Sequence, residues 1–225
     1  MKKVNSIFDV IGPIMVGPSS SHTAGAAKLA RIARSLCGEE IKKVTFQLHG
    51  SFQTTYKGHG TDRALLAGIL GLSPSDPGLV NAYELAKEAG LEYEFVKKDL
   101  GPVHPNTIKF IITGVSGNIS EIVGASIGGG EVLISSLNGI SVNFSGNSYT
   151  VISIQDDTPG IVSEISRVFA KSGINMATIT LSRSARGKEG TMITEIDSAP
   201  SEQDLARLRA LPHVKKIICY MPVNE

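Results

Sequence analysis

The chain has 225 residues, of which 41% are hydrophobic and 19% are charged. Lysine plus arginine (22) nearly balances aspartate plus glutamate (21), so no excess of charge favours binding to nucleic acid or to an anionic membrane. No apolar run in the sequence approaches the ~20 residues of a membrane-spanning helix, and the start, MKKVNSIFDVIGPI, lacks the features of a secretion signal. We therefore expect a cytoplasmic protein of one or two domains with a substantial core.

The first part of the chain, residues 1–146, mixes helix and strand patterns. Apolar residues at helical spacing predict a helix over 22–38, which Gly38 ends. Strict alternation predicts a strand over 41–48 that delivers His49 at its end. A second helix is expected from Thr61 as N-cap to residue 72. The remaining expected elements are a helix over 75–90 and strands over 91–100, 106–114, 120–127, 130–137 and 140–146.

The second part, residues 147–225, has the pattern β-α-β-β-α-β. Strands are expected over 149–157, 174–185, 191–197 and 214–222, and helices over 158–173 and 201–212, the latter capped by Ser201. Strands in this order with two crossover helices give a ferredoxin-like plait. The sequence therefore predicts an α+β protein of two domains, 1–146 and 147–225.

Four of the five histidines lie in short, polar segments of the first part that contain glycine. His22 lies in GPSSSHTAG (17–25), His49 and His59 lie in HGSFQTTYKGHGTD (49–62), and His104 lies in GPVHPNT (101–107). Histidine has the side-chain pKa nearest neutrality, so imidazoles that converge with hydroxyl groups indicate proton transfer or ligand binding. His213, between the last helix and the last strand, is interpreted as a turn residue.

The serine tract before His22 lies where a helix begins. Ser19, Ser20 and Ser21 are therefore placed either to bind a carboxylate at the helix N-terminus or simply to cap the helix. The glycine patterns of nucleotide-binding loops are absent from this tract of the sequence. Three serines followed by His22 favour a loop that faces a ligand.

The other three segments carry further candidates. Glycines on both sides of His59 leave space for a ligand, whereas His49 is equally well explained as a turn residue. Lys57 is either a cation for a carboxylate or a solvated charge, and Asp62 is either an orienting partner of a histidine or a solvated charge. Three further residues stand in loops: His104 and Asn106, held by a stiff proline, and Gly129 in SIGGGE (126–131), which is either a hairpin turn or a ligand-binding nest.

The second part resembles an ACT domain, a small amino-acid-sensing module of metabolic enzymes. The resemblance rests on DDTPGIVSEISRVFAKSGINM (156–176). It implies that Asp156, Pro159, Gly160 and Asn175 surround an amino-acid effector and that such domains pair side by side. A purely structural role in assembly is the open alternative, because many ferredoxin-like plaits bind no small molecule.

The four segments GPSSSHTAG, HGSFQTTYKGHGTD, HPNT and SIGGGE, in this order, resemble the β subunit of the iron–sulfur-dependent L-serine dehydratases. The resemblance covers nearly the whole chain, and the first domain is also similar to the allosteric substrate-binding domain of phosphoglycerate dehydrogenase. It implies conversion of L-serine to pyruvate and ammonia with a [4Fe-4S] cluster that the partner α subunit ligates, together with activation by a monovalent cation. This chain itself would contribute no metal ligand.

The residues assigned by these arguments fall into two groups. Removal of the Cα proton of serine needs a base, for which His22 and His59 are the candidates. The choice between them stays open. The residues expected to bind the substrate are Ser19, Ser20, Ser21, Thr23, His49, Ser51, Lys57, His104, Asn106 and Gly129.

The two cysteines, Cys37 and Cys219, are interpreted as small buried hydrophobic residues. Two thiolates do not make the usual ligand set of an iron–sulfur cluster, which agrees with a cluster on a partner chain.

Two other classes of function compete with a catalytic subunit. A non-catalytic effector-binding module is the first, although such a module would not require four histidines. A stand-alone serine–histidine hydrolase is the second, and it is disfavoured because the sequence has no GxSxG motif.

Overall fold

The computed structural model describes residues 14–183 and 185–222. The chain forms two compact units: the first ends at Ser145, and the second runs from Gly146 to Pro222. The start of the chain, on which the expectation about a secretion signal depends, lies outside the described residues. In the described ranges, no helix combines the length and the apolar character needed to cross a membrane.

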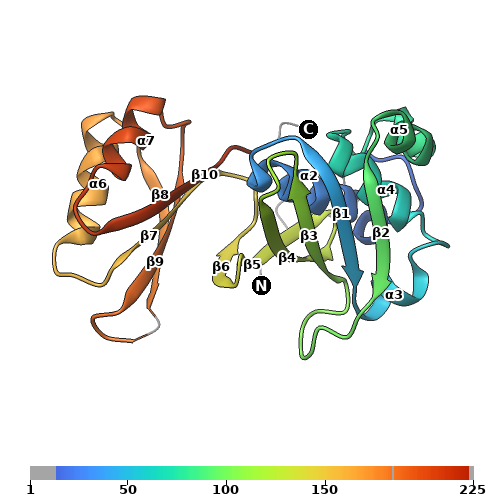
Figure 1. Cartoon of the computed structure of the whole chain (residues 1–225), viewed down its shortest axis with the longest axis horizontal. Helices are drawn as coiled ribbons and strands as arrows, with labels where there is room; N and C mark the ends of the chain where they lie inside the picture. The colour runs from blue at the N-terminus through green and yellow to red at the C-terminus, as the bar shows by residue number, and fades with distance from the viewer. Residues whose placement is uncertain (1–13, 184, 223–225) are drawn as a thin grey trace. The chain divides into compact units, whose positions relative to one another are not determined.

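The first unit is built on a six-stranded sheet with the order β2-β1-β3-β4-β5-β6 (Figure 1). β1 and β2 are parallel, and the other neighbouring strands are antiparallel. Parallel neighbours need a long crossover, and the helices between β1 and β2 provide it. The strands are β1 (Ile41–Leu48), β2 (Glu92–Lys97), β3 (Thr107–Gly114), β4 (Ile119–Gly128), β5 (Glu131–Leu137) and β6 (Ile140–Phe144).

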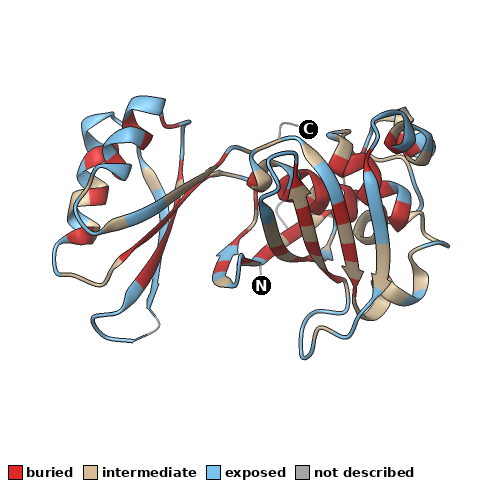
Figure 2. Cartoon of the chain, viewed as in Figure 1, coloured by how far each residue is buried: buried red, intermediate tan, exposed pale blue. Residues whose placement is uncertain are grey.

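Helices of the first unit cover one face of this sheet, with α2 lying against β3, β4 and β5. α2 and α4 pack closely because Gly68 has no side chain: a β-carbon there would lie 2.3 Å from the carbonyl oxygen of Ala27. The core between helices and sheet includes the fully buried Leu29, Phe46 and Phe110, and Figure 2 shows buried residues along α2 and the central strands. The helical segments are η1 (Ser20–Gly25, a π-helix), α2 (Ala26–Cys37), α3 (Gly50–Thr55), α4 (Thr61–Leu70), η2 (Pro77–Asn81, a 3₁₀-helix) and α5 (Ala82–Glu88).

Two sequence expectations about these helices are wrong. The N-cap of α4 is Gly60, in a left-handed conformation with φ 67°, and Thr61 is instead the first, fully buried residue of the helix. The helix expected over 75–90 is divided into η2 and α5, because Pro77 and Gly78 open a tight 3₁₀ turn that Asp76 caps. α3 was not expected, because its segment buries only Phe52 and shows no apolar periodicity.

The second unit is a four-stranded antiparallel sheet with two helices, in the order β10-β7-β9-β8. Its elements follow the expected β-α-β-β-α-β sequence, and a full capping box at Ser201 begins the second helix. The elements are β7 (Tyr149–Asp156), α6 (Ile161–Lys171), β8 (Met176–Arg183), β9 (Glu189–Ile196), α7 (Glu202–Arg209) and β10 (Val214–Tyr220). The predicted fold class, α+β with a C-terminal ferredoxin-like unit, is confirmed.

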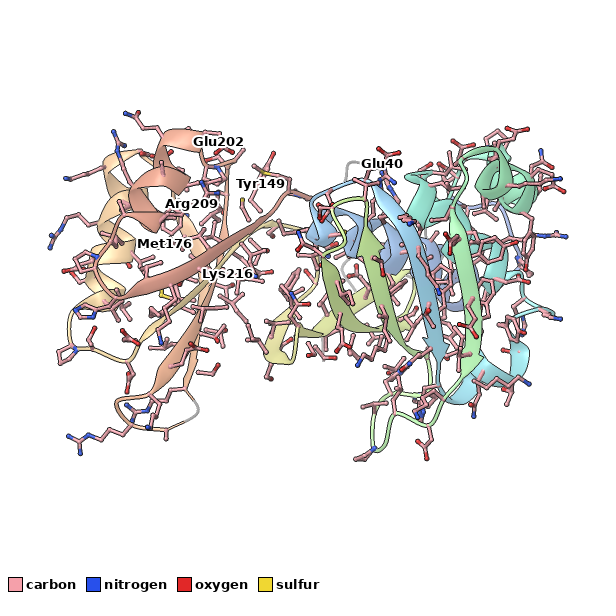
Figure 3. All side chains as sticks on the ribbon, in the orientation of Figure 1. Glu40, Tyr149, Met176, Glu202, Arg209 and Lys216 are labelled. Atoms are coloured by element: carbon pink, nitrogen blue, oxygen red, sulfur yellow. The ribbon has the colours of Figure 1, made fainter. Side chains whose placement is uncertain are left out.

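The core of the second unit lies between its sheet and its helices. Fully or nearly fully buried side chains include Val151 and Met192 from the sheet and Ile165 and Phe169 from α6. Tyr149 and Met176, labelled in Figure 3, are half-buried and pack against this core. The buried residues of α6 recur at helical spacing, so its apolar face packs against the sheet.

Candidate active site

His22 lies at the centre of a polar cluster in the first unit. It is in the π-helical turn η1, where its backbone N–H donates to Ser19 Oγ at 3.1 Å, so Ser19 caps the helix. Its Nε2 is 3.0 Å from Ser51 Oγ on α3. The His22 ring lies 4.8 Å from the His59 ring and 5.2 Å, edge to face, from the Phe52 ring. Single π-helical turns are frequent at functional sites because they redirect side chains.

Burial, and secondly the positive form of neighbouring His59, lower the pKa of His22 below its ordinary value of 6.5. Both effects disfavour the charged form of the imidazole, burial more than the neighbouring ring, so His22 is held in its neutral form at neutral pH. A neutral imidazole has one nitrogen free to accept a proton. The geometry therefore gives His22 the properties of a general base.

His59, the second histidine of the cluster, is held in place by hydrogen bonds of its own backbone. Its carbonyl oxygen accepts a hydrogen bond from Thr23 Oγ1 at 3.2 Å, and its N–H donates to the carbonyl oxygen of Thr55 at 3.1 Å. Thr23 is buried, so its hydroxyl positions the His59 loop. Ser20 and Ser21 are half-buried in the first turn of η1, beside His22 in the chain.

The HPN loop reaches this cluster through backbone contacts. The Ser51 N–H donates to the carbonyl oxygen of Pro105 at 2.8 Å, and Gly50 permits the approach because a β-carbon there would lie 2.5 Å from the same oxygen. Gly50 has φ 54°, a left-handed conformation that glycine adopts without strain. Two segments that are distant in the sequence are thereby joined next to His22.

His49 and His104 have more local roles in this arrangement. His49 Nδ1 accepts a hydrogen bond from the Leu100 N–H at 3.1 Å, so the neutral ring carries its proton on Nε2. Asp99, whose side chain is 86% exposed, lies 3.5 Å from the same nitrogen. Because that nitrogen is already an acceptor, we interpret the Asp99 contact as incidental. His104 is exposed, and its Nδ1 accepts from the Asn106 N–H at 3.1 Å.

Ser126 on β4 is a candidate site residue that sequence reasoning missed. It forms two hydrogen bonds with Asn106: the Ser126 N–H donates to the Asn106 carbonyl oxygen at 3.0 Å, and the side-chain amide nitrogen Nδ2 of Asn106 donates to the Ser126 carbonyl oxygen at 3.4 Å. Ser126 Oγ is fully buried and has no hydrogen-bond partner among the described residues. It lies against η1, since a β-carbon on Gly25 would be only 2.1 Å away. A buried, unsatisfied hydroxyl is a donor available to a ligand.

The glycines after Ser126 form the turn between β4 and β5. Gly128, Gly129 and Gly130 all have positive φ, at 107°, 60° and 81°. The sequence therefore had a signal for Ser126 in the motif SIGGGE. The sequence prediction instead named Gly129 as the substrate-binding residue of this motif, three residues after Ser126.

A pocket of about 540 Å³ opens beside His59. It is lined by charged side chains, among them Lys57, Arg63 and Asp62, and by Thr23 and Tyr83. Lys57 is exposed, with Nζ 5.9 Å from the centre of the neighbouring Tyr56 ring. Two cations and one carboxylate leave the lining with a positive balance, which suits a ligand that carries a carboxylate.

Asp62 does not orient a histidine through any hydrogen bond among the described residues. Its Oδ2 accepts from the Tyr83 hydroxyl at 2.7 Å, and its Oδ1 accepts from the Arg63 N–H at 2.9 Å. Burial and the adjacent carboxylate raise the pKa of Tyr83, so the phenol stays protonated and continues to donate. Asp62 therefore orients the hydroxyl of Tyr83 and not a histidine.

In the second unit, the four residues predicted to face an effector do not form one cluster. Asp156 pairs with Lys215 at 2.7 Å, and this partner lowers the pKa of the carboxyl. Asn175 Nδ2 donates to Asp197 Oδ2 at 2.7 Å. Pro159 precedes Gly160, which is the N-cap of α6 with φ 92°.

Gln155 and Asp157 are neighbours of Asp156 that the sequence did not single out. Gln155 is buried, and neither its Nε2 nor its Oε1 has a hydrogen-bond partner among the described residues. Asp157 Oδ2 accepts from Arg183 Nη1 at 2.8 Å and from the Gly187 N–H at 3.1 Å. An unsatisfied buried amide is rare and marks a place where a ligand can bind. Alternate positions on β7 face alternate sides, so only the structure distinguishes Gln155 from Asp156.

The described residues of this chain do not fit an iron–sulfur cluster. They contain no group of three or more His, Cys, Asp or Glu side chains arranged to hold a metal ion. Cys37 and Cys219 are both free and belong to different units. Burial raises the pKa of Cys37, and it raises the pKa of Cys219 to about 11, so both thiols stay protonated at neutral pH.

Comparison with known proteins gives the family. Residues 6–91 match the model of the serine dehydratase beta chain, and residues 148–213 match the ACT domain. Over 215 residues the chain is 40% identical to the probable L-serine dehydratase, beta chain, of Bacillus subtilis, a match that covers 96% of this chain and 97% of that protein. The chain belongs to the L-serine dehydratase beta-chain family. The predicted resemblance is thereby confirmed.

Further relatives of this beta chain agree with that assignment. It is 43% identical over 198 residues to the L-serine dehydratase, beta chain, of Peptoniphilus asaccharolyticus, with 88% of this chain and 89% of that protein covered. It is also 26% identical over 189 residues to D-3-phosphoglycerate dehydrogenase of Archaeoglobus fulgidus, a match that covers 83% of this chain but 35% of that protein. The expected relation to a phosphoglycerate dehydrogenase region is thus found over most of the chain.

Proposed function

We propose that this beta chain is the acid–base half of an L-serine dehydratase that converts L-serine to pyruvate and ammonia. The observation that carries the proposal is the meeting of His22, Ser51 and His59. Nε2 of His22 lies 3.0 Å from Ser51 Oγ, and the two imidazole rings are 4.8 Å apart. The named relatives support the substrate, since both full-length matches are beta chains of L-serine dehydratases.

The reaction requires a base near the Cα of serine. In the proposed step His22, which is neutral because its pKa is lowered, accepts the Cα proton, and the β-hydroxyl leaves as water after gaining a proton. The resulting enamine becomes an imine, and a second water hydrolyses it to pyruvate and ammonia. In this proposal Ser51 orients the His22 ring through its hydroxyl group, and His59, whose ring is 4.8 Å away, exchanges protons with His22. Between the two candidates, His22 is the better base because it is held neutral and oriented.

The substrate carboxylate needs hydrogen-bond donors and positive charge. We assign it to the region between the buried hydroxyl of Ser126, the amide of Asn106 and the serines of η1, and Lys57 and Arg63 line the pocket beside His59. A site built to hydrogen-bond a carboxylate discriminates strongly against analogues that lack it. Ser126→Ala is therefore expected to raise KM for serine more than it lowers kcat.

The iron–sulfur cluster of the proposed enzyme is assigned to the partner α subunit. This assignment rests on the ligand chemistry of the present chain, whose described residues provide no fitting set. Activation by a monovalent cation remains part of the proposal. The chemistry assigned to this chain is limited to binding serine and moving its protons.

Reconstitution tests the proposal directly. The beta chain and its candidate α chain are combined anaerobically, and pyruvate formation from L-serine is measured with His22→Gln, His59→Gln and the matched control His213→Asn. His213 is a histidine of the second unit with φ 69°, a conformation that asparagine tolerates. Loss of turnover in the first two variants and full turnover in the control is the expected result. Equal activity of the α chain alone and of the pair would overturn the proposal.

A second candidate function, binding of an amino-acid effector by the ACT unit, is favoured by Gln155. Its buried, unpartnered amide lies on β7 next to Asp156 and Asp157, near the N-terminus of α6. We expect L-serine or another amino acid to bind here with its charged groups on these polar side chains. Isothermal titration with Gln155→Leu tests it, since this variant should lose effector binding and retain turnover. If the Gln155→Leu variant still bound the effector, the effector site would not include Gln155.

We also propose that the ACT unit mediates self-association. β8 is an edge strand of its sheet and leaves Ile179 and Leu181 exposed by 44% and 47%. An edge strand with exposed apolar side chains readily pairs with a second chain. Leu181→Lys should therefore shift the chain toward the monomer in analytical ultracentrifugation, and an unchanged mass would contradict this assignment.

A further inference from the structure

The two helices of the ACT unit border a second pocket, which includes neither Gln155 nor Asp156 in its lining. Its volume is about 770 Å³. Glu164, Arg167, Val168 and Lys171 come from α6 at positions i, i+3, i+4 and i+7, so they lie on one face of that helix. Arg207, Ala210, Leu211 and Pro212 complete the lining from α7 and the residues that follow it.

Three cations and one carboxylate face this pocket, which gives its lining a positive balance. Arg207 is held in place by Asp204, whose Oδ1 is 3.2 Å from Arg207 Nη1, and its other donors remain available. Asp204 is itself fixed by Ser172 and Ser201. Neither Arg167 nor Lys171 forms a hydrogen bond or an ion pair within the described part of the chain. Lys171 and Arg207 stand in the last turns of their helices, where cations offset the helix dipole. Arg167 is outside the last turn of α6, so the helix dipole does not account for its charge.

The floor of the pocket is apolar. Val168 is 7% exposed and belongs to the core of the unit, and Leu211 packs against the same core. A site with guanidinium and ammonium groups above an apolar floor matches a small ligand that carries two negative charges and a hydrocarbon portion. A second copy of the same face is a poor occupant, because two positive grooves repel each other.

We propose that this α6–α7 groove is an anion-binding site for a small organic dianion, either a phosphate monoester or a dicarboxylate. Arg167 and Arg207 would bind the anionic oxygens as planar, multidentate donors, and Lys171 would add a point charge. The site is separate from the histidine cluster, and its occupancy is measured without turnover. Its failure is therefore distinguishable from failure of the proposed dehydratase function.

Titration of the full chain with defined anions tests the proposal. The probes are phenyl phosphate, inorganic phosphate and succinate. Their binding is measured by isothermal titration calorimetry at low salt and by the changes in the amide chemical shifts of α6 and α7. We expect saturable binding of at least one dianion, with shifts at both helices, and weakening at higher ionic strength. Phenyl phosphate binding more tightly than inorganic phosphate indicates the monoester, and succinate binding more tightly than both indicates the dicarboxylate.

Matched variants separate this site from general surface charge. Arg167→Gln and Lys171→Gln should each raise the dissociation constant about tenfold, the loss of one charge-assisted contact. Lys216→Gln is the control, because Lys216 is an exposed lysine on β10 of the same unit (Figure 3). All three positions are exposed, so folding is retained and is verified by thermal melting. Saturable binding by neither phenyl phosphate nor succinate, even if inorganic phosphate binds, would overturn the proposal, and so would an equal loss in Lys216→Gln.

Discussion

The two units use their polar side chains in different ways, although each packs helices on a sheet. In the first unit, His22, Ser51 and His59 meet without a carboxylate partner among the described residues, and the pKa of His22 is lowered. In the ACT unit the carboxylates are paired, as with Asp156 and Lys215. A neutral imidazole that lies close to a hydroxyl group and a second imidazole can exchange protons, whereas paired charges are fixed in one state. The contrast agrees with the proposed function, in which the first unit moves protons and the ACT unit serves regulation or assembly.

The largest expected effect separates the two units by activity. His22→Ala should lower kcat of the reconstituted enzyme by about 10²–10⁴-fold, the usual contribution of a general base. Arg209→Gln on α7, which removes only an exposed ion pair with Glu202 at 3.8 Å, should leave kcat unchanged. Steady-state pyruvate formation measures both. A similar loss in the two variants would mean that His22 acts through structure alone.

The next effect compares the cores. Phe52 and Phe169 are each fully buried, the first beside His22 and the second on the core-facing side of α6, so replacement by alanine should cost about 3–5 kcal/mol in either unit. The loss should stay within the unit that carries the change. Hydrogen exchange resolved by residue measures this. If both units lost protection equally in either variant, they would fold as one cooperative body.

Two glycines give a smaller effect. Gly25→Ala places a β-carbon 2.1 Å from Ser126 Oγ, so overpacking should cost about 1–3 kcal/mol and distort the site. Gly173→Ala in the ACT unit meets no atom within 4 Å and should cost about 1 kcal/mol, because its φ of 67° is strained for alanine. Urea unfolding and KM for serine are the measurements. An unchanged KM in Gly25→Ala would argue against Ser126 as a substrate contact.

The smallest effect is a difference in pH dependence. The folded pKa of His22 lies below 6.5, so the unfolded chain binds the proton more tightly, and the first unit should begin to lose stability as pH falls through about 6.5. Asp156 and Asp204 have folded pKa values below 3.8, so the ACT unit keeps their stabilisation above that pH and loses it as pH falls further. Pulse proteolysis between pH 7 and pH 3 measures both. His22→Gln should flatten the first slope, and an unchanged slope would contradict this origin.

Much of the fold followed from residue patterns. Strict alternation gave the bounds of β1, and helical spacing gave α2 up to its glycine stop. Patterns failed where the signal is not periodic. α3 buries only Phe52, and the helix expected over 75–90 divides at Asn81 because a proline and a glycine occupy the start of that segment.

The candidate site was partly visible in the same way. Histidine chemistry led to His22 and His59, and the structure brings their rings together. Nothing in the sequence indicated that Asp62 would bind Tyr83 instead of a histidine, or that Ser126 would lie against Gly25. These contacts join segments far apart in the chain, so no local propensity reports them.

The sequence by itself determined the two-unit α+β organisation, the family, and the residue types of the candidate site. Only the tertiary structure decided which of these residues meet: His22 with Ser51 and His59, and Asn106 with Ser126. The physical reason is that apolar periodicity is a local property of a helix or strand, whereas the position and pKa of a polar side chain depend on packing between distant segments.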